Sequence, residues 1–148
     1  MQLRYIRAMA TSTSYRLAPE LKGRLARQAA AERTTETALV SRLLEQGLSA
    51  LAHPGIVYRP GPSGWRAGIA GGPDVDEVVR AIRSGGASGD KAVLATAASL
   101  GIDARLVRLA IDYAAEHFDE IEARLRENEE AAERVRKLTV ARSAVLTG

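Results

Sequence analysis

The sequence predicts a mainly α-helical protein of two modules, with a short N-terminal strand and a small β-hairpin. Three observations support this fold class. Apolar residues recur every three or four positions through most of the chain, which indicates amphipathic helices. Apolar and polar residues alternate over residues 11–17, which indicates a strand. A stretch rich in Pro and Gly, residues 53–73, contains two short runs of strand character and separates the modules.

The first module is predicted over residues 9–52, and Met9 is a candidate for the native start. The two faces of its strand consist of Thr13, Tyr15 and Leu17, and of Ser12, Ser14 and Arg16. Pro19 ends the strand and begins a helix, since proline is tolerated in the first helical turn. A second helix follows at once, with Thr34 or Thr35 as its N-cap and Glu36 in its first turn.

This first module exposes more apolar surface than it can bury alone. About forty residues is near the size at which a single chain cannot build a sufficient core, and a lone strand has no partner for its backbone groups. We therefore expect two copies to pair their strands antiparallel and to interlock their helices. The predicted dimer core consists of Tyr15, Leu17, Leu21, Leu25, Leu39 and Leu43.

The order of a strand, the motif RLAPEL, a helix, a Thr-rich turn and a Leu-rich helix resembles the ribbon-helix-helix family of DNA-binding proteins, which includes Arc, MetJ and CopG-like repressors and antitoxins. The resemblance implies a ribbon-helix-helix dimer whose two-stranded ribbon lies in the DNA major groove. Its implied DNA-binding residues are Ser12, Ser14 and Arg16 on the ribbon, and Thr35 and Thr37 at a helix N-terminus that clamps a phosphate. Family members often carry Gly just before this helix, whereas this chain has Arg33 and Thr34. An edge strand that only dimerises is the alternative.

The charges divide unevenly between the two modules. Residues 1–55 hold eight Lys/Arg against four Asp/Glu, a net charge of +4, whereas residues 56–148 hold thirteen against fourteen. The basic module is thus the one with the predicted DNA-reading strand, as phosphate binding favours. The chain has no Cys and no apolar run of transmembrane length, and its first residues are too polar for a signal peptide. We expect a cytoplasmic protein without membrane contact.

The second module is predicted over residues 53–137, as a hairpin and a helical bundle, followed by a tail over 138–148. The hairpin turns at PGPSG, a helix begins with Pro73 in its first turn, and Asp103 caps a later helix that follows Gly101. The segments GIVYR, WRAGIAGGPDVDEVVRAI and AIDYAAEHFDEIEARL resemble a helix-turn-helix-like antitoxin domain of the VapB type, which is found beside PIN-like ribonuclease toxins. The resemblance implies a toxin partner. The alternative is a second DNA-reading helix that uses Arg105 and Arg108.

The last helix carries a heptad-like seam, which favours a contact along its length. Its positions are Phe118, Ile121, Leu125, Asn128, Ala132, Val135 and Thr139. Three occupants compete for this seam: the helix's own domain, a second copy in a coiled coil, and a groove of the toxin. The predicted toxin-binding residues are Phe118, Ile121, Leu125, Asn128, Arg124 and Arg126.

No motif indicates an enzyme, a metal site or a cofactor. The two His residues, His53 and His117, lie in separate modules, and we interpret them as a linker residue and a helix-end cation. The function hypothesis is an antitoxin that neutralises a PIN-like ribonuclease and represses its own operon as a homodimer or a higher oligomer. The alternatives are a ribbon-helix-helix regulator without a toxin, whose second domain oligomerises or senses a ligand, and an interaction protein that does not touch DNA.

Overall fold

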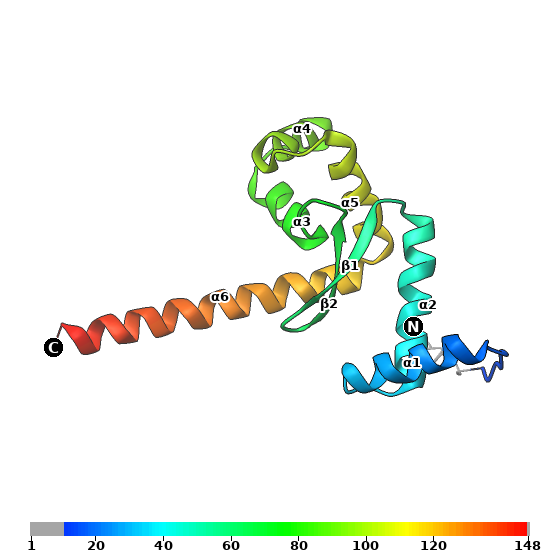
Figure 1. Ribbon diagram of the computed structural model, residues 1–148. Coiled ribbons are helices and arrows are strands. Elements are labelled where there is room, and N and C mark those ends of the chain that lie inside the picture. Colours follow the sequence, from blue (N-terminus) through cyan, green and yellow to red (C-terminus); the bar gives the residue numbers. More distant parts are fainter. Residues whose placement is uncertain (1–10, 148) are drawn as a thin grey trace, which may run out of the picture. The chain divides into compact units, whose positions relative to one another are not determined.

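Figure 1 shows the computed structural model of the chain, which describes residues 11–147. The elements are α1 (Pro19–Ala31), α2 (Glu36–Ala52), β1 (Ile56–Gly61), β2 (Gly64–Ile69), α3 (Val75–Ser84), α4 (Gly89–Leu100), α5 (Ala104–Glu116) and α6 (Phe118–Leu146). The mainly helical fold with one small hairpin is confirmed. The chain divides between Leu44 and Glu45 into two compact units, which we call the N-terminal unit and the C-terminal unit. This division falls inside α2, ahead of the Pro- and Gly-rich stretch. Met9, the candidate start, lies outside the described residues.

The predicted strand over residues 11–17 is wrong for the single chain. Residues 11–18 have no regular secondary structure, and the only sheet within residues 11–147 is the two-stranded hairpin. An extended segment forms strand hydrogen bonds only beside a second strand. No other segment described in the chain supplies that second strand, so the alternating pattern of residues 11–17 is not sufficient to make one.

The two helices of the N-terminal unit begin as the sequence predicts. Pro19 is the first residue of α1, and the Thr35 hydroxyl caps α2 by accepting a hydrogen bond from the Ala38 amide at 3.1 Å. Between the helices, Arg33 has a φ of 54°, in the left-handed region that favours glycine. The turn between the helices therefore holds Arg33 in a conformation that is strained for a residue other than glycine.

The hairpin lies across the Pro- and Gly-rich stretch, as predicted. Its strands pair antiparallel from Ile56 opposite Ile69 to Gly61 opposite Gly64, so the loop is only Pro62 and Ser63. A two-residue loop demands special backbone angles, and Gly64 supplies a φ of 107°. The strands therefore include Pro60, Gly61 and Gly64, and the loop is three residues shorter than the motif PGPSG indicates.

The helices of the C-terminal unit have well-formed ends. Asp74 caps α3 in a capping box, in which the Glu77 carboxylate accepts a hydrogen bond from the Asp74 amide at 3.0 Å. The prediction that Pro73 is the first helical residue is wrong, because α3 begins at Val75 and Pro73 precedes the cap. Gly101 closes α4 with a φ of 64°, and Asp103 caps α5. The predicted helix, glycine turn and helix are confirmed.

The core of the C-terminal unit lies between the hairpin and the helices α3, α4, α5 and the start of α6. Its largest fully buried side chains are Ile69, Val75, Val78, Val107 and Tyr113. Burial and a hydrogen bond with Tyr58 raise the pKa of Tyr113 well above its usual range, so its hydroxyl stays protonated. α3 is the central element, since it packs against α4, α5, α6 and β2.

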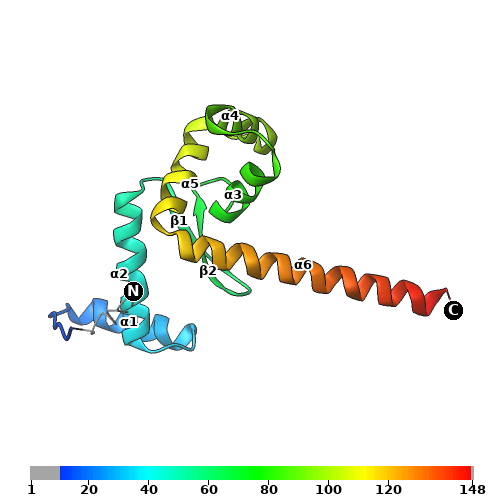
Figure 2. The same ribbon diagram turned by 180° about the vertical axis from the view of Figure 1, so that it is seen from behind.

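α6 is the longest helix and continues far past the rest of its unit (Figure 1 and Figure 2). The segment over 138–148 that the sequence designates a tail is part of this helix as far as Leu146. Within the described part of the chain, no helix combines the length and the apolar character needed to cross a membrane.

Candidate nucleic-acid and partner interfaces

The predicted DNA-reading segment lies directly ahead of α1 and is open to solvent. Ser12, Ser14 and Arg16 are exposed, and so are Tyr15 at 79% and Leu17 at 44%. In the single chain, the residues predicted to face DNA bases and those predicted to face the dimer core are therefore both exposed to solvent. Separating these two sets requires a second strand beside this segment.

The N-terminus of α2 carries a neutralised acidic residue. Thr35 is its cap, Thr37 is exposed in its first turn, and Glu36 forms an ion pair with Lys22 of α1. A negative charge at this position opposes phosphate binding, and the Lys22 ammonium offsets it. Sequence reasoning missed the contact between Lys22 and Glu36, because the two residues are far apart in the chain.

The predicted dimer core forms one face of the N-terminal unit, and most of it is uncovered. Leu39 is buried and Leu25 is half-buried, whereas Leu21 and Leu43 are 47% and 49% exposed. These four leucines line one groove of about 470 Å³. The sequence therefore placed them correctly on a common face, and that face has no partner within the described chain.

A salt bridge ties α1 to α2 beneath this face. Arg42 donates two hydrogen bonds to the Glu32 carboxylate, at 2.6 and 3.0 Å. This guanidinium, together with the Gln28 amide, lowers the pKa of Glu32 to about 2. The pairing is bidentate and therefore fixes the orientation of the two helices within the unit.

Two residues of the predicted toxin-binding seam pack inside the C-terminal unit. Ile121 and Leu125 are 4% and 8% exposed and belong to the core cluster. Of the six predicted residues, Phe118 and Arg126 are exposed. The seam of α6 thus begins as packing on its own domain, the first of the three occupants that the sequence allowed.

The polar residues of this part of α6 also make contacts within the unit. The Arg124 guanidinium donates to the Trp65 carbonyl at 2.9 Å and to the Ser63 hydroxyl at 3.0 Å, both on the hairpin. The Asn128 amide donates to the Asp76 carboxylate on α3 at 2.8 Å. Arg124 and Asn128 therefore hold α6 against the hairpin and α3.

Asp76 is a buried acid at the start of α3. Its side chain lies among the core helices, and the residue is 5% exposed. Burial, and after it the neighbouring Asp74 carboxylate, raises the pKa of Asp76. The hydrogen bond from Asn128 is therefore one of the few contacts that compensates for burying this group.

Beyond Asn128 the large apolar side chains of α6 are exposed. Val135, Leu138, Val140, Val145 and Leu146 are 60% to 84% exposed. Leu138, Val145 and Leu146 line a shallow groove of about 440 Å³ on one face of the helix, and Val140 lies on another face. Sequence reasoning included Val135 in the seam and missed the others, because it ended the domain at 137. Leu138 and Val145 share a face with each other, but they are one residue out of register with the seam, which continues from Val135 to Thr139.

The cations of α5 are paired with acids. Arg108 contacts the Asp90 carboxylate at 3.0 Å, and Arg105 contacts Asp103 at 3.8 Å. A helix that reads DNA presents cations that are free for phosphates or bases. These pairings favour the helical bundle over the alternative of a second DNA-reading helix.

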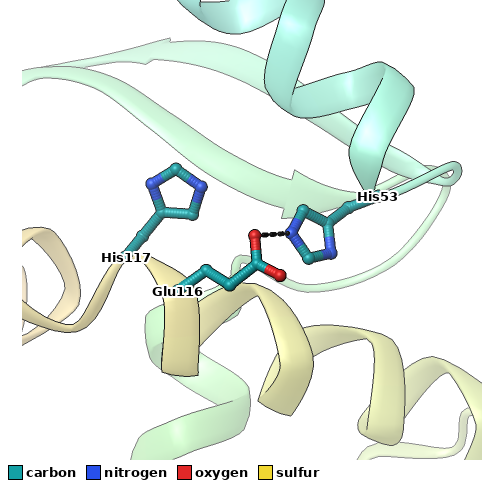
Figure 3. Close-up of side chains that lie close together, drawn as sticks. All are labelled: His53, Glu116 and His117. Atoms are coloured by element: carbon teal, nitrogen blue, oxygen red, sulfur yellow. Dashed lines mark hydrogen bonds and ion pairs between the residues drawn. The ribbon is translucent and has the colours of Figure 1, made fainter.

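The structure corrects the interpretation of the two histidines. Sequence reasoning separated His53 and His117 into different modules, whereas the C-terminal unit brings both beside Glu116 (Figure 3). His53 is 6% exposed, so it is a buried residue and not a linker residue. His53 and Glu116 are far apart in the chain, and no local spacing could have indicated the contact.

No protein-family model, curated protein or solved structure matches the chain.

Proposed function

We propose that the chain is a homodimeric, DNA-binding antitoxin that neutralises a PIN-like ribonuclease toxin and represses its own operon. The observation that carries the proposal is that two apolar faces lie open on an otherwise packed protein: the leucine face of α1 and α2, and the bare end of α6. The leucine face lies where the sequence resemblance implies a partner, whereas the bare end of α6 lies beyond the residues predicted to bind the toxin. A second copy covers the first face, and the toxin covers the second.

The dimer supplies what the N-terminal unit lacks. Leu21 and Leu43 are half-exposed beside the groove, and Tyr15 and Leu17 are exposed ahead of α1. Burying such side chains stabilises by about 25 cal/mol per Å² of apolar surface removed from water. In the proposed dimer, the two segments over 11–17 also become each other's strand partners, and their polar faces form the DNA-reading ribbon.

The electrostatics of the N-terminal unit suit DNA. Ser12, Ser14 and Arg16 are exposed and free to face base edges, where Arg pairs with guanine through two hydrogen bonds. The Lys22 ion pair neutralises Glu36, which lowers the barrier to a phosphate at the N-terminus of α2. Phosphate contacts then fix the position of the dimer, and the ribbon supplies the sequence preference.

The end of α6 suits a helix-binding groove on the toxin. Leu138 and Val145 lie on one face of the helix, whereas the charged residues Glu133 and Arg136, which form an ion pair, lie on the opposite side. An amphipathic helix of this kind binds by placing spaced apolar anchors in a hydrophobic groove. Arg126 and Phe118 lie outside this face, and Ile121 and Leu125 are already buried.

The proposed DNA binding is tested by changing Arg16 to Ala. The measurement is gel retardation of a DNA fragment taken from upstream of the chain's own gene. We expect operator affinity to fall by about 1 to 3 kcal/mol for each hydrogen-bonded base that Arg16 no longer reads. The matched control is Arg80→Ala, which removes an exposed cation from the C-terminal unit. Equal binding by the wild type and by Arg16→Ala would refute the ribbon assignment.

The proposed toxin binding is tested by co-expressing the chain with the product of the neighbouring reading frame. Leu138→Asp with Val145→Asp should abolish co-purification and neutralisation, because both changes place charge on the bare apolar face. Ser143→Asp is the control for each single change, since it adds one negative charge on another side of α6. A double variant that still neutralises the toxin would place the toxin surface elsewhere, and the lack of any nuclease partner would favour the regulator without a toxin.

A further inference from the structure

The two histidines of the chain and one glutamate converge in the C-terminal unit (Figure 3). His53 Nε2 lies 2.9 Å from a carboxylate oxygen of Glu116, and the Glu116 carboxylate lies between the His53 and His117 rings in Figure 3. One ligand atom from each of the three residues lies within 4.8 Å of the other two. Two imidazoles and a carboxylate are the donor set that zinc takes in three-ligand protein sites.

Backbone contacts hold each donor in position. His53 is the first residue after α2 and begins the turn to β1, where its amide donates to the Ser49 carbonyl and its carbonyl accepts from the Ile56 amide. Glu116 is the last residue of α5, and His117 is the single residue between α5 and α6. The donors thus come from two places in the chain that the fold brings together, which is the arrangement a structural metal ion stabilises best.

A buried aromatic ring orients both imidazoles. The Tyr113 ring stacks on His117 with centroids 4.2 Å apart, and it meets the edge of the His53 ring at 5.5 Å. Tyr113 is itself 1% exposed and therefore has no freedom to move away. Fixed rings of this kind reduce the ordering that a metal must impose on its ligands.

The site is closed on one side and open on the other. The His53 side chain is 7% exposed, whereas the Glu116 side chain is 65% exposed. A metal ion can therefore enter from the Glu116 side, and water can occupy a fourth position.

We propose that His53, Glu116 and His117 form a binding site for a divalent transition-metal ion of the zinc class. Imidazole nitrogens favour such ions, whereas Mg²⁺ and Ca²⁺ prefer all-oxygen sites. The bound ion links the turn between α2 and β1 to the junction of α5 and α6, so it stabilises the C-terminal unit. This role is independent of DNA and of the toxin.

The test is calorimetric titration of the full chain with zinc sulfate, after purification without a polyhistidine tag. Because the chain has no Cys and only these two His, zinc bound through imidazole can bind only here. We expect one zinc ion per chain, a higher melting temperature with zinc, and shifted ring-proton resonances of both His. Glu116→Gln and His117→Gln should each weaken binding by about tenfold or more.

Asp112→Asn is the matched control, because Asp112 is an exposed acid one turn before Glu116 on the same helix. Its zinc affinity should equal that of the wild type. Circular dichroism without zinc shows whether each variant has folded. If His53→Gln does not fold, Glu116→Gln and His117→Gln still test the proposal, because these two ligands are more exposed than His53. The proposal is overturned if the wild type binds no zinc in excess metal, or if Glu116→Gln and His117→Gln bind it as tightly as the wild type.

Discussion

The two units of the chain use the same kind of amphipathic helix but differ in how completely they cover it. In the C-terminal unit, the apolar sides of α3, α4, α5 and the start of α6 meet the hairpin and bury a common core. In the described part of the N-terminal unit, only Ala29 and Leu39 are buried apolar residues, and most of the leucine face is open. An apolar stripe therefore shows which side of a helix must be buried by other residues. It does not show whether those residues belong to the same chain.

The largest expected effect tests whether the C-terminal core is self-sufficient. Ile69 lies at the end of β2 and is fully buried. Ile69→Ala should lower the free energy of unfolding by about 2 to 5 kcal/mol, because it removes buried methyl groups and leaves a cavity. Urea unfolding followed by circular dichroism measures this. Val145→Ala, on the bare end of α6, should change stability by less than about 0.5 kcal/mol. Similar losses of stability in the two variants would contradict the comparison.

A smaller effect is expected at the ion-pair cluster that joins the hairpin to α3. Asp74 contacts the guanidinium groups of Arg59 at 2.8 Å and Arg66 at 3.0 Å, and it also caps α3. Asp74→Ala should cost about 2 to 3 kcal/mol, since it removes the cap and leaves two cations without this partner. Glu77→Ala removes only the reciprocal hydrogen bond of the capping box and should cost about 1 kcal/mol or less. Equal costs would show that the two ion pairs contribute nothing to stability.

The Tyr113 hydroxyl provides a finer test of the same core. It lies 3.2 Å from the Tyr58 hydroxyl and 3.3 Å from a Glu120 carboxylate oxygen. Tyr113→Phe keeps the ring and removes these hydrogen bonds, so we expect stability to fall by about 1 kcal/mol in thermal or urea unfolding. Tyr15→Phe, at an exposed tyrosine, is the control and should leave stability unchanged. If the variant at Tyr113 is as stable as the wild type, the core depends on the ring alone.

The smallest effect concerns the salt bridge of the N-terminal unit. Because the folded state lowers the pKa of Glu32 from 4.5 to about 2, the ionised carboxylate stabilises the unit above pH 4.5. This contribution is lost as the pH falls through about 2, where the folded carboxylate becomes protonated. Thermal unfolding of the wild type and of Glu32→Gln should therefore differ at neutral pH and converge toward about pH 2. A constant difference over this range would show that the Arg42 pairing does not stabilise the unit.

Local chemistry made much of the fold predictable. Pro19 at a helix start, Gly101 in the left-handed conformation and Asp103 at a cap act on their immediate neighbours, and the structure confirms all three. The alternating pattern over 11–17 wrongly predicted a strand, because strand hydrogen bonds depend on a second segment. Contacts between distant residues were also missed: Asn128 with Asp76, and His53 with Glu116. Their partners are decided by the packing of whole helices and not by any spacing in the sequence.

The bare end of α6 also bears on how long the free protein survives. Apart from its i,i+4 and i,i+3 side-chain pairs, nothing in the described unit packs over the helix beyond Ala132. Helical segments that open locally at low free energy are where proteolytic enzymes cut first. A partner that covers this segment would protect it, so we expect the free chain to be degraded faster than the chain in the proposed complex. The lifetime of the chain would then depend on whether a partner is bound to the end of α6.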